Sequence, residues 1–119
     1  MRIYKLKYSE IAVLCAIYIL ERHLQQSDRS TRAVTDYLMS KGVMNNIKSG
    51  YTNNGGRIHE LHYRYGLIEP RARQVVVGQP RNDYSITKAG WEHIKVFYEK
   101  YRSPIEGQPL EIILYLRIT

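Results

Sequence analysis

The fold of this chain is decided by residues 53–94, which read NNGGRIHELHYRYGLIEPRARQVVVGQPRNDYSITKAGWEHI. Apolar residues recur every three or four positions up to Tyr65, which is the spacing of one helical face. Gly66 ends this helix, and two stretches rich in β-branched residues then flank a cluster of turn-forming residues at 78–83. A second helical pattern follows Thr87. The segment therefore predicts a helix, a β-hairpin and another helix.

The first helix of this segment carries two adjacent glycines. We expect it to begin between Ser49 and Asn54, after a turn-rich stretch, and to end at Tyr65. Gly55 and Gly56 lower helix propensity by about 1 kcal/mol each relative to alanine. Their missing side chains allow close backbone approach, and the neighbour is more often another helix than a phosphate. We therefore expect the preceding helix to pack against this pair.

The hairpin strands are expected at residues 68–77 and 84–87, on either side of the turn cluster. Pro70 places the start of the first strand at an edge or after a bend, because proline donates no ladder hydrogen bond. Arg71 and Arg73 are two residues apart, so their side chains are expected to project from the same strand face.

Two more helices are expected before this segment. The first runs from about Glu10 to about Leu24, after Ser9, whose hydroxyl is suited to capping. Its apolar residues cover two stripes, so it is either central to its domain or shared with a second subunit, and a homodimer is predicted. The second helix runs from Thr31, another capping residue, to about Lys41, with Gly42 as its left-handed stop.

The helix after the hairpin is expected to begin with Thr87 as its cap and to reach Tyr101. Residues 103–109 then read as a linker, and residues 110–119 as a terminal strand that could pair with the alternating residues 2–8. The core-facing residues of the helix are expected to be Trp91, Ile94 and either Phe97 or Tyr98.

Length and charge limit the possible functions. With 119 residues and 14.0 kDa, the chain fits a single domain with a core of about residues 9–101. A net charge of +7 and a pI near 9.6 favour a polyanionic partner such as nucleic acid. The alternative is that the basic surface only aids solubility.

The single cysteine and the short apolar runs indicate the compartment. Cys15 has no partner for an intrachain disulfide, which suits a reducing environment. The longest apolar stretch, residues 11–20, is about half of a bilayer span, and no signal-peptide cleavage pattern is evident. The sequence therefore predicts a soluble cytoplasmic protein without membrane partners.

Two motifs resemble parts of the winged helix-turn-helix family. Residues 57–61 (RIHEL) followed by 65–68 (YGLI) are similar to the third helix of such domains, and residues 84–90 (YSITKAG) to the segment that closes the wing. The resemblance implies an α+β fold with a three-helix core, a β-hairpin wing, a C-terminal helix and a terminal strand. The turn before the third helix, at residues 43–50, is longer than in a minimal helix-turn-helix. Small stand-alone domains of this family are common in phages, archaeal viruses and plasmids.

In this family the third helix enters the major groove of DNA and the wing contacts the backbone or the minor groove. Asparagine can pair with adenine, and arginine can contact phosphates or base edges. By that resemblance, the helix residues expected to bind DNA are Lys48, Tyr51, Thr52, Asn53, Asn54, Arg57 and Arg64. The wing residues expected to bind DNA are Arg71, Arg73 and Arg81. The alternatives are helix capping for the two asparagines, an ion pair with Glu60 for Arg57, and a solvated strand for the wing arginines.

The sequence thus predicts sequence-specific binding of double-stranded DNA, as in a transcriptional regulator. Two alternatives stay open, namely a winged helix used for protein contact and binding of RNA or single-stranded DNA. No catalytic constellation, cofactor fingerprint or small-molecule effector site is evident, so the chain is not expected to be an enzyme. His59 and His62 are spaced for one helical face but lack a third ligand, so no metal site is expected.

Overall fold

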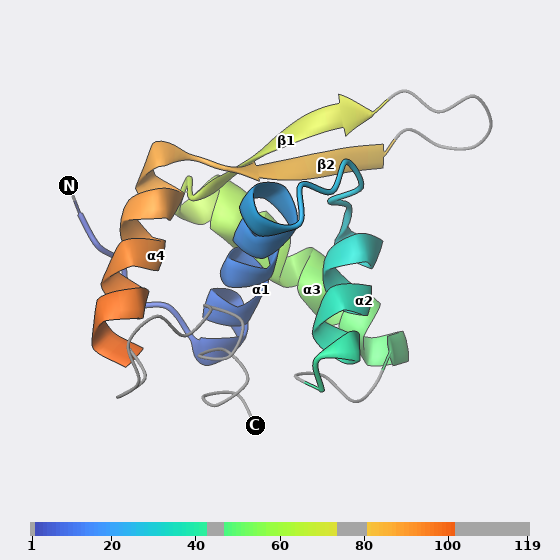
Figure 1. The fold of residues 1–119 in the computed structure, drawn as a ribbon, viewed down its shortest axis with the longest axis horizontal. Coiled ribbons are helices and arrows are strands. Elements are labelled where there is room, and N and C mark those ends of the chain that lie inside the picture. Colours follow the sequence, from blue (N-terminus) through green and yellow to red (C-terminus); the bar gives the residue numbers. More distant parts are fainter. Residues whose placement is uncertain (1, 43–46, 74–80, 102–119) are drawn as a thin grey trace.

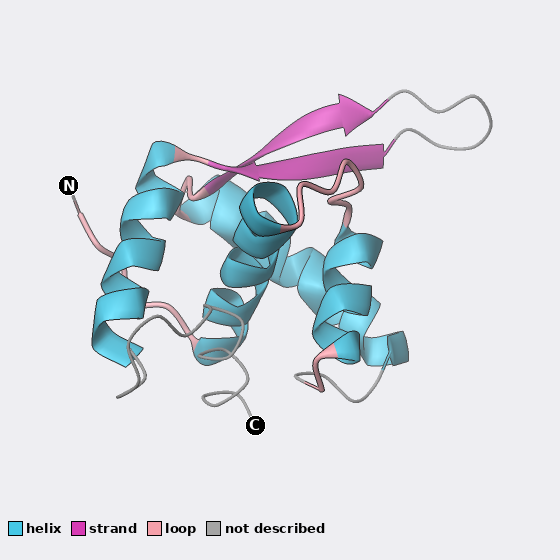
Figure 2. Ribbon diagram, viewed as in Figure 1, coloured by secondary structure: helices cyan, strands magenta, loops and turns pink. Residues whose placement is uncertain are grey.

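The computed structural model describes residues 2–42, 47–73 and 81–101. Within these residues the protein has an α+β fold with four α-helices and one two-stranded antiparallel sheet (Figure 1, Figure 2). The elements are α1 (Tyr8–Tyr18), continued by the π-helical turn η1 (Ile19–His23); α2 (Thr31–Ser40); α3 (Ile47–His59), continued by the π-helical turn η2 (Glu60–Arg64); β1 (Ile68–Arg73); β2 (Arg81–Ile86); and α4 (Lys88–Tyr101). None of the described helices is long and apolar enough to cross a membrane.

Helix α1 is the centre of the core. Every residue from Ile11 to Ile17 is at most 6% exposed, because α2, α3, α4 and β2 all pack against this helix. Figure 1 shows α1 in the middle of the molecule, between α4 and α2. The apolar residues from Ile11 to Ile17 are thus buried within a single chain, and this segment needs no second subunit to cover it. The homodimer therefore stays a prediction, and the two apolar stripes no longer support it.

Cys15 lies in this helix, and burial raises the pKa of its thiol from 9.0 to about 12. Because the thiolate is the reactive form, we expect the thiol to react with a disulfide reagent at pH 8 only when the chain unfolds. The labelling rate should rise with urea and match the unfolded fraction measured by circular dichroism. Rapid labelling of the folded protein would contradict this burial. Since the folded pKa lies above the unfolded one, this thiol's contribution to stability is present below pH 9.0 and is lost toward pH 12.

The helix ends follow local rules, with two corrections at the starts. Helix α1 begins at Tyr8, and Glu10 accepts a hydrogen bond from the Lys7 amide (2.9 Å), so Ser9 is not its cap. Ser30, rather than Thr31, caps α2 by accepting from the Ala33 amide (3.3 Å). The N-cap residue thus lies two residues earlier than predicted in α1, at Lys7, and one residue earlier in α2, at Ser30. The predicted stops Gly42 and Gly66 are confirmed, with φ of 72° and 65°.

The loop before α2 lies along the outer edge of β2. The Tyr84 amide donates to the Arg29 carbonyl (3.2 Å), and the Arg29 amide donates to the Asp83 carboxylate (2.9 Å). The Arg29 guanidinium donates to the Tyr84 carbonyl (2.9 Å) and to the Ser85 hydroxyl (3.2 Å). On its other edge β2 pairs with β1, with Pro70 opposite Tyr84. Arg29 therefore connects the helical half of the chain to the hairpin.

The segment around Thr87 fixes α4 to the end of η2. The Thr87 hydroxyl donates to the Gly66 carbonyl (2.7 Å) and accepts from the Gly90 amide (3.1 Å), which confirms Thr87 as the cap of α4. The Thr87 amide donates to the Leu67 carbonyl (3.1 Å). At Gly90 a Cβ atom would collide with that same carbonyl oxygen. The close contact between the start of α4 and Leu67 thus requires a threonine at position 87 and a glycine at position 90.

The buried face of α4 differs from the predicted one at Trp91. Ile94 and Phe97 are buried as expected, but Trp91 is 40% exposed. His93 takes the inward position and is fully buried, where its Nε2 accepts from the Tyr4 amide (2.9 Å) and its Nδ1 lies 2.7 Å from the Ala89 carbonyl. Gly90 determines how α4 is rotated about its axis, because the position that faces Leu67 has no room for a side chain.

The strands and chain ends differ in part from the predicted boundaries. Strand β2 begins at Arg81, three residues before Tyr84, because Arg73 and Arg81 already face each other in the register. Residues 2–7 form no strand in the structure. The second half of the first predicted strand, and the predicted linker and strand at 103–119, lie outside the described residues.

Candidate nucleic-acid interface

Helix α3 has one buried face and one polar, solvent-exposed face. Its buried residues include Ile58, which packs in the core near Leu61 of η2. The helix begins at Ile47, two residues before the earliest predicted start, and it packs along α2. The exposed residues along the outward face of α3 and η2 are Thr52, Asn53, Gly56, His59 and Tyr63.

The paired glycines Gly55 and Gly56 of α3 do not serve helix packing. A Cβ atom built on Gly55 or on Gly56 would meet nothing within 4 Å, so the expected close contact with the preceding helix is wrong. Gly56 is exposed and lies one turn after Thr52 and Asn53, which are also exposed. The outward face of α3 therefore has a short stretch of bare backbone next to polar side chains. An external partner can approach the helix axis more closely there than a side chain would allow.

Asn54 is placed differently from the prediction. It is fully buried between α3 and α2, where its amide nitrogen donates to the Thr35 hydroxyl (2.9 Å). Its side-chain oxygen accepts from the Arg57 guanidinium (2.8 Å), and the Thr35 hydroxyl donates to the Thr31 carbonyl (2.8 Å). Asn54 is therefore a packing residue and is not presented to a ligand, contrary to the sequence-based expectation. Arg57 pairs with this amide and not with Glu60.

We expect Asn54→Ala to lower the free energy of unfolding by about 1–3 kcal/mol, because it leaves buried polar partners unsatisfied and a small cavity. Urea denaturation followed by circular dichroism measures the change. Asn53→Ala is the matched control, since that neighbouring side chain is exposed and its loss should alter stability by less than about 0.5 kcal/mol. Equal losses in the two variants would contradict the burial of Asn54.

Two other candidates of the helix already have partners within the protein. Tyr51 donates from its hydroxyl to the Asp36 carboxylate (2.7 Å), and this hydrogen bond raises the pKa of Tyr51 above 10.0. Arg64 lies 3.5 Å from the Glu60 carboxylate, an exposed pair one helical turn apart. Such a surface pair contributes little to stability, so Arg64 can exchange Glu60 for a phosphate at small cost. For Lys48 the structure describes only the position of the backbone in α3.

The hairpin arginines share one face of the sheet. The register places Arg71 opposite Asp83 and Arg73 opposite Arg81, so these four positions lie on one face of the sheet. Ile68 and its partner Ile86 lie on the opposite face. Arg71 and Arg81 are exposed. In Figure 1 the C-terminal end of β1 and the N-terminal end of β2 lie at the upper right of the molecule and the first turn of α3 at the lower right, with α2 between them.

An aromatic group on η2 lies outside the candidate residues predicted from the sequence. Tyr63 is 73% exposed, and its ring lies 4.5 Å from that of His59 and 4.4 Å from that of His62, measured between ring centroids. The four-residue spacing of His59 and Tyr63 was a usable signal, since such residues are neighbours on a helix. Among the described residues, no three His, Cys, Asp or Glu side chains are placed to hold a metal ion.

Comparison with protein-family models, curated proteins and solved structures finds no match for this chain. The interface must therefore be interpreted from its own residues. Of the eight candidates whose side chains the structure describes, five are exposed on α3, η2 and the hairpin. These are Thr52, Asn53, Arg64, Arg71 and Arg81.

Proposed function

We propose that this protein is a winged-helix protein that binds double-stranded DNA sequence-specifically and regulates transcription. Helix α3 would enter the major groove, and the β1–β2 hairpin would act as the wing along the backbone or minor groove. The observation that carries the proposal is the outward face of α3, where Gly56 leaves bare backbone beside exposed Thr52 and Asn53. The order of elements, three helices followed by a hairpin and a fourth helix, is compatible with this family.

The chemistry of this surface suits a duplex better than a protein partner. Threonine and asparagine side chains offer donors and acceptors to base edges, while a glycine lets the helix lie deep in a groove. Arg71 and Arg81 on the hairpin are exposed, and they would contact phosphates, which fix the position of a protein on DNA. The net charge of +7 supports attraction to a polyanion.

The first test is fluorescence anisotropy with a labelled random duplex over a series of salt concentrations. We expect binding, and the logarithm of its association constant should fall linearly with the logarithm of the salt concentration. The slope should steepen by about 0.9 for each phosphate contacted. Preference for the unpaired strand would indicate binding of RNA or single-stranded DNA instead. Absence of duplex binding at low salt would favour the use of this surface for protein contact.

Sequence specificity needs a second test, namely selection from a pool of random duplexes. A regulator is expected to enrich a short motif over successive rounds. Asn53→Ala should then lose discrimination at one or two base pairs, by about 1–3 kcal/mol for each lost pairing. Enrichment without any motif would restrict the proposal to general DNA binding.

A further inference from the structure

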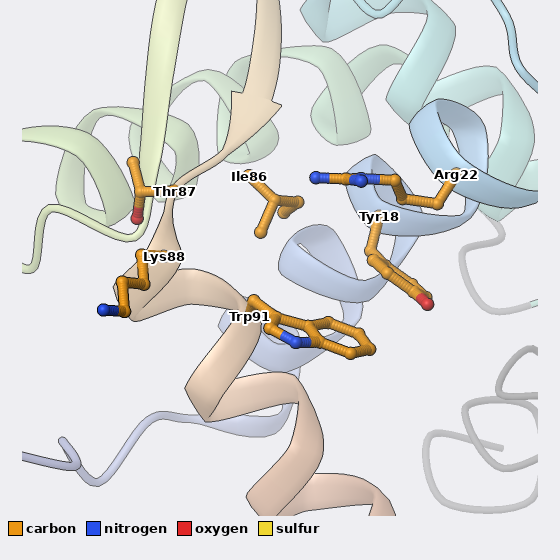
Figure 3. A pocket seen from close by; sticks show the side chains of 6 residues that line it. All are labelled: Tyr18, Arg22, Ile86, Thr87, Lys88 and Trp91. Atoms are coloured by element: carbon orange, nitrogen blue, oxygen red, sulfur yellow. The ribbon is translucent and has the colours of Figure 1, made fainter.

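A pocket of about 550 Å³ lies where the end of α1, the end of β2 and the start of α4 meet (Figure 3). Neither α3 nor the hairpin residues Arg71 and Arg81 line this pocket. Its size lies in the range of small-molecule sites. The lining residues are Tyr18, Arg22, Ile86, Thr87, Lys88 and Trp91.

Two stacked aromatic rings form one wall of the pocket. The centroids of Tyr18 and Trp91 lie 5.1 Å apart with an angle of 23° between the ring planes. Trp91 is 40% exposed, although the same helix buries His93 completely. Ile86 forms the apolar back of the pocket, and its amide donates to the Glu21 carboxylate (3.0 Å), which fixes this wall. The pocket thus offers flat, apolar contact area to a ring.

Polar recognition falls to Arg22. The Thr87 hydroxyl already bonds Gly66 and Gly90, so it is occupied within the protein. In Figure 3 the Arg22 guanidinium extends over the pocket toward Ile86, on the side opposite Trp91. Its Nε lies 4.0 Å from the Glu21 carboxylate, beyond hydrogen-bond distance, and its side chain is 63% exposed. Lys88 adds positive charge at the rim, although its ammonium points away from Trp91 in this view.

We propose that this pocket binds a planar aromatic anion, with the ring against Trp91 and Tyr18 and the carboxylate or phosphate against Arg22. A guanidinium matches either oxyanion with two parallel hydrogen bonds, and aromatic rings pack favourably in offset or tilted arrangements. A neutral ring would lack the contact to Arg22, and a small inorganic anion would lack the ring contacts. The site is independent of the proposed duplex binding, because the two use different elements.

Trp91 is the single tryptophan of the chain, so its indole N–H gives one NMR signal that reports from the pocket itself. Benzoate and phenyl phosphate are the probes, and benzamide and acetate are the comparison compounds. We expect saturable shifts of the Trp91 signal with benzoate or phenyl phosphate. The tighter of these two identifies the oxyanion. Benzamide and acetate should each bind about tenfold more weakly, which corresponds to the loss of one charge-assisted pairing or of the stacking.

Arg22→Gln should weaken binding of the anionic probe about tenfold while leaving the affinity for benzamide unchanged. Arg32→Gln is the matched control, since Arg32 is also an exposed arginine beside a carboxylate, that of Asp36, but lies on α2, and it should bind the probe normally. Circular dichroism checks that both variants fold. The proposal is overturned if neither probe saturates in the millimolar range, if benzamide binds as tightly as benzoate, or if the two variants lose affinity equally. Each of these outcomes leaves the duplex-binding test unaffected.

Discussion

Replacing Gly90 with alanine is expected to lower the free energy of unfolding by about 1–3 kcal/mol, the usual cost of forcing an extra methyl group into a packed site. Gly90 is buried, and its added Cβ would collide with the Leu67 carbonyl oxygen and lie 3.0 Å from a methyl carbon of Ile86. The carbonyl belongs to the backbone and is already hydrogen-bonded to Thr87, so it cannot move aside without breaking the cap of α4. Urea denaturation measures the loss.

Gly56→Ala is the control for this prediction. It also adds one methyl group to a helical glycine, but that group would meet nothing within 4 Å. The better helix propensity of alanine should therefore raise the free energy of unfolding by about 0.5–1 kcal/mol. If Gly90→Ala were as stable as the original protein, α4 could not pack on Leu67 as described.

The double variant Arg71→Ala/Arg81→Ala is expected to bind duplex DNA about 10- to 100-fold more weakly at low salt. Two phosphate contacts would be lost, so the slope of log affinity against log salt should become shallower by about 1.8, or twice the 0.9 of a single contact. Both side chains are exposed, and therefore the fold should tolerate their removal. Anisotropy titrations over several salt concentrations give both quantities.

The matched control removes the same charge from another part of the surface. Lys88→Ala/Lys95→Ala changes two exposed cations of α4, which the proposed interface does not include. This pair should reduce affinity only slightly, through the smaller net charge. Equal losses in the two double variants would indicate general attraction to a basic protein. An unchanged affinity in the hairpin variant would exclude the hairpin from the interface.

Features that depend on a few neighbouring residues could be predicted from the sequence. Gly42 and Gly66 were identified as helix stops because a left-handed φ favours glycine wherever the helix lies in the fold. Thr87 was identified as a cap because the hydroxyl and the amide that it accepts from are three residues apart. The α+β class followed from the order of these signals.

Features that depend on distant contacts could not be predicted in this way. Asn54 looks like an exposed polar residue beside Asn53, but the hydroxyl of Thr35, 19 residues earlier, gives it a buried partner. Trp91 is more exposed than expected, and His93 takes the inward position, because Gly90 must face Leu67. The pocket combines residues 18–22 with residues 86–91, and no local pattern connects these two segments.

The placement of Arg29 has a consequence for self-association through backbone pairing. Because the Tyr84 amide bonds to Arg29, it points away from β1, and Tyr84 and Pro70 form a pair without mutual hydrogen bonds. The Pro70 nitrogen therefore lies on the outer side of β1, where a proline has no hydrogen to donate. The outer edge of β2 is thus occupied by Arg29, and the outer edge of β1 lacks a hydrogen-bond donor at Pro70. Growth of the sheet from molecule to molecule is disfavoured on both sides, and any dimer of this protein is expected to form through its helices.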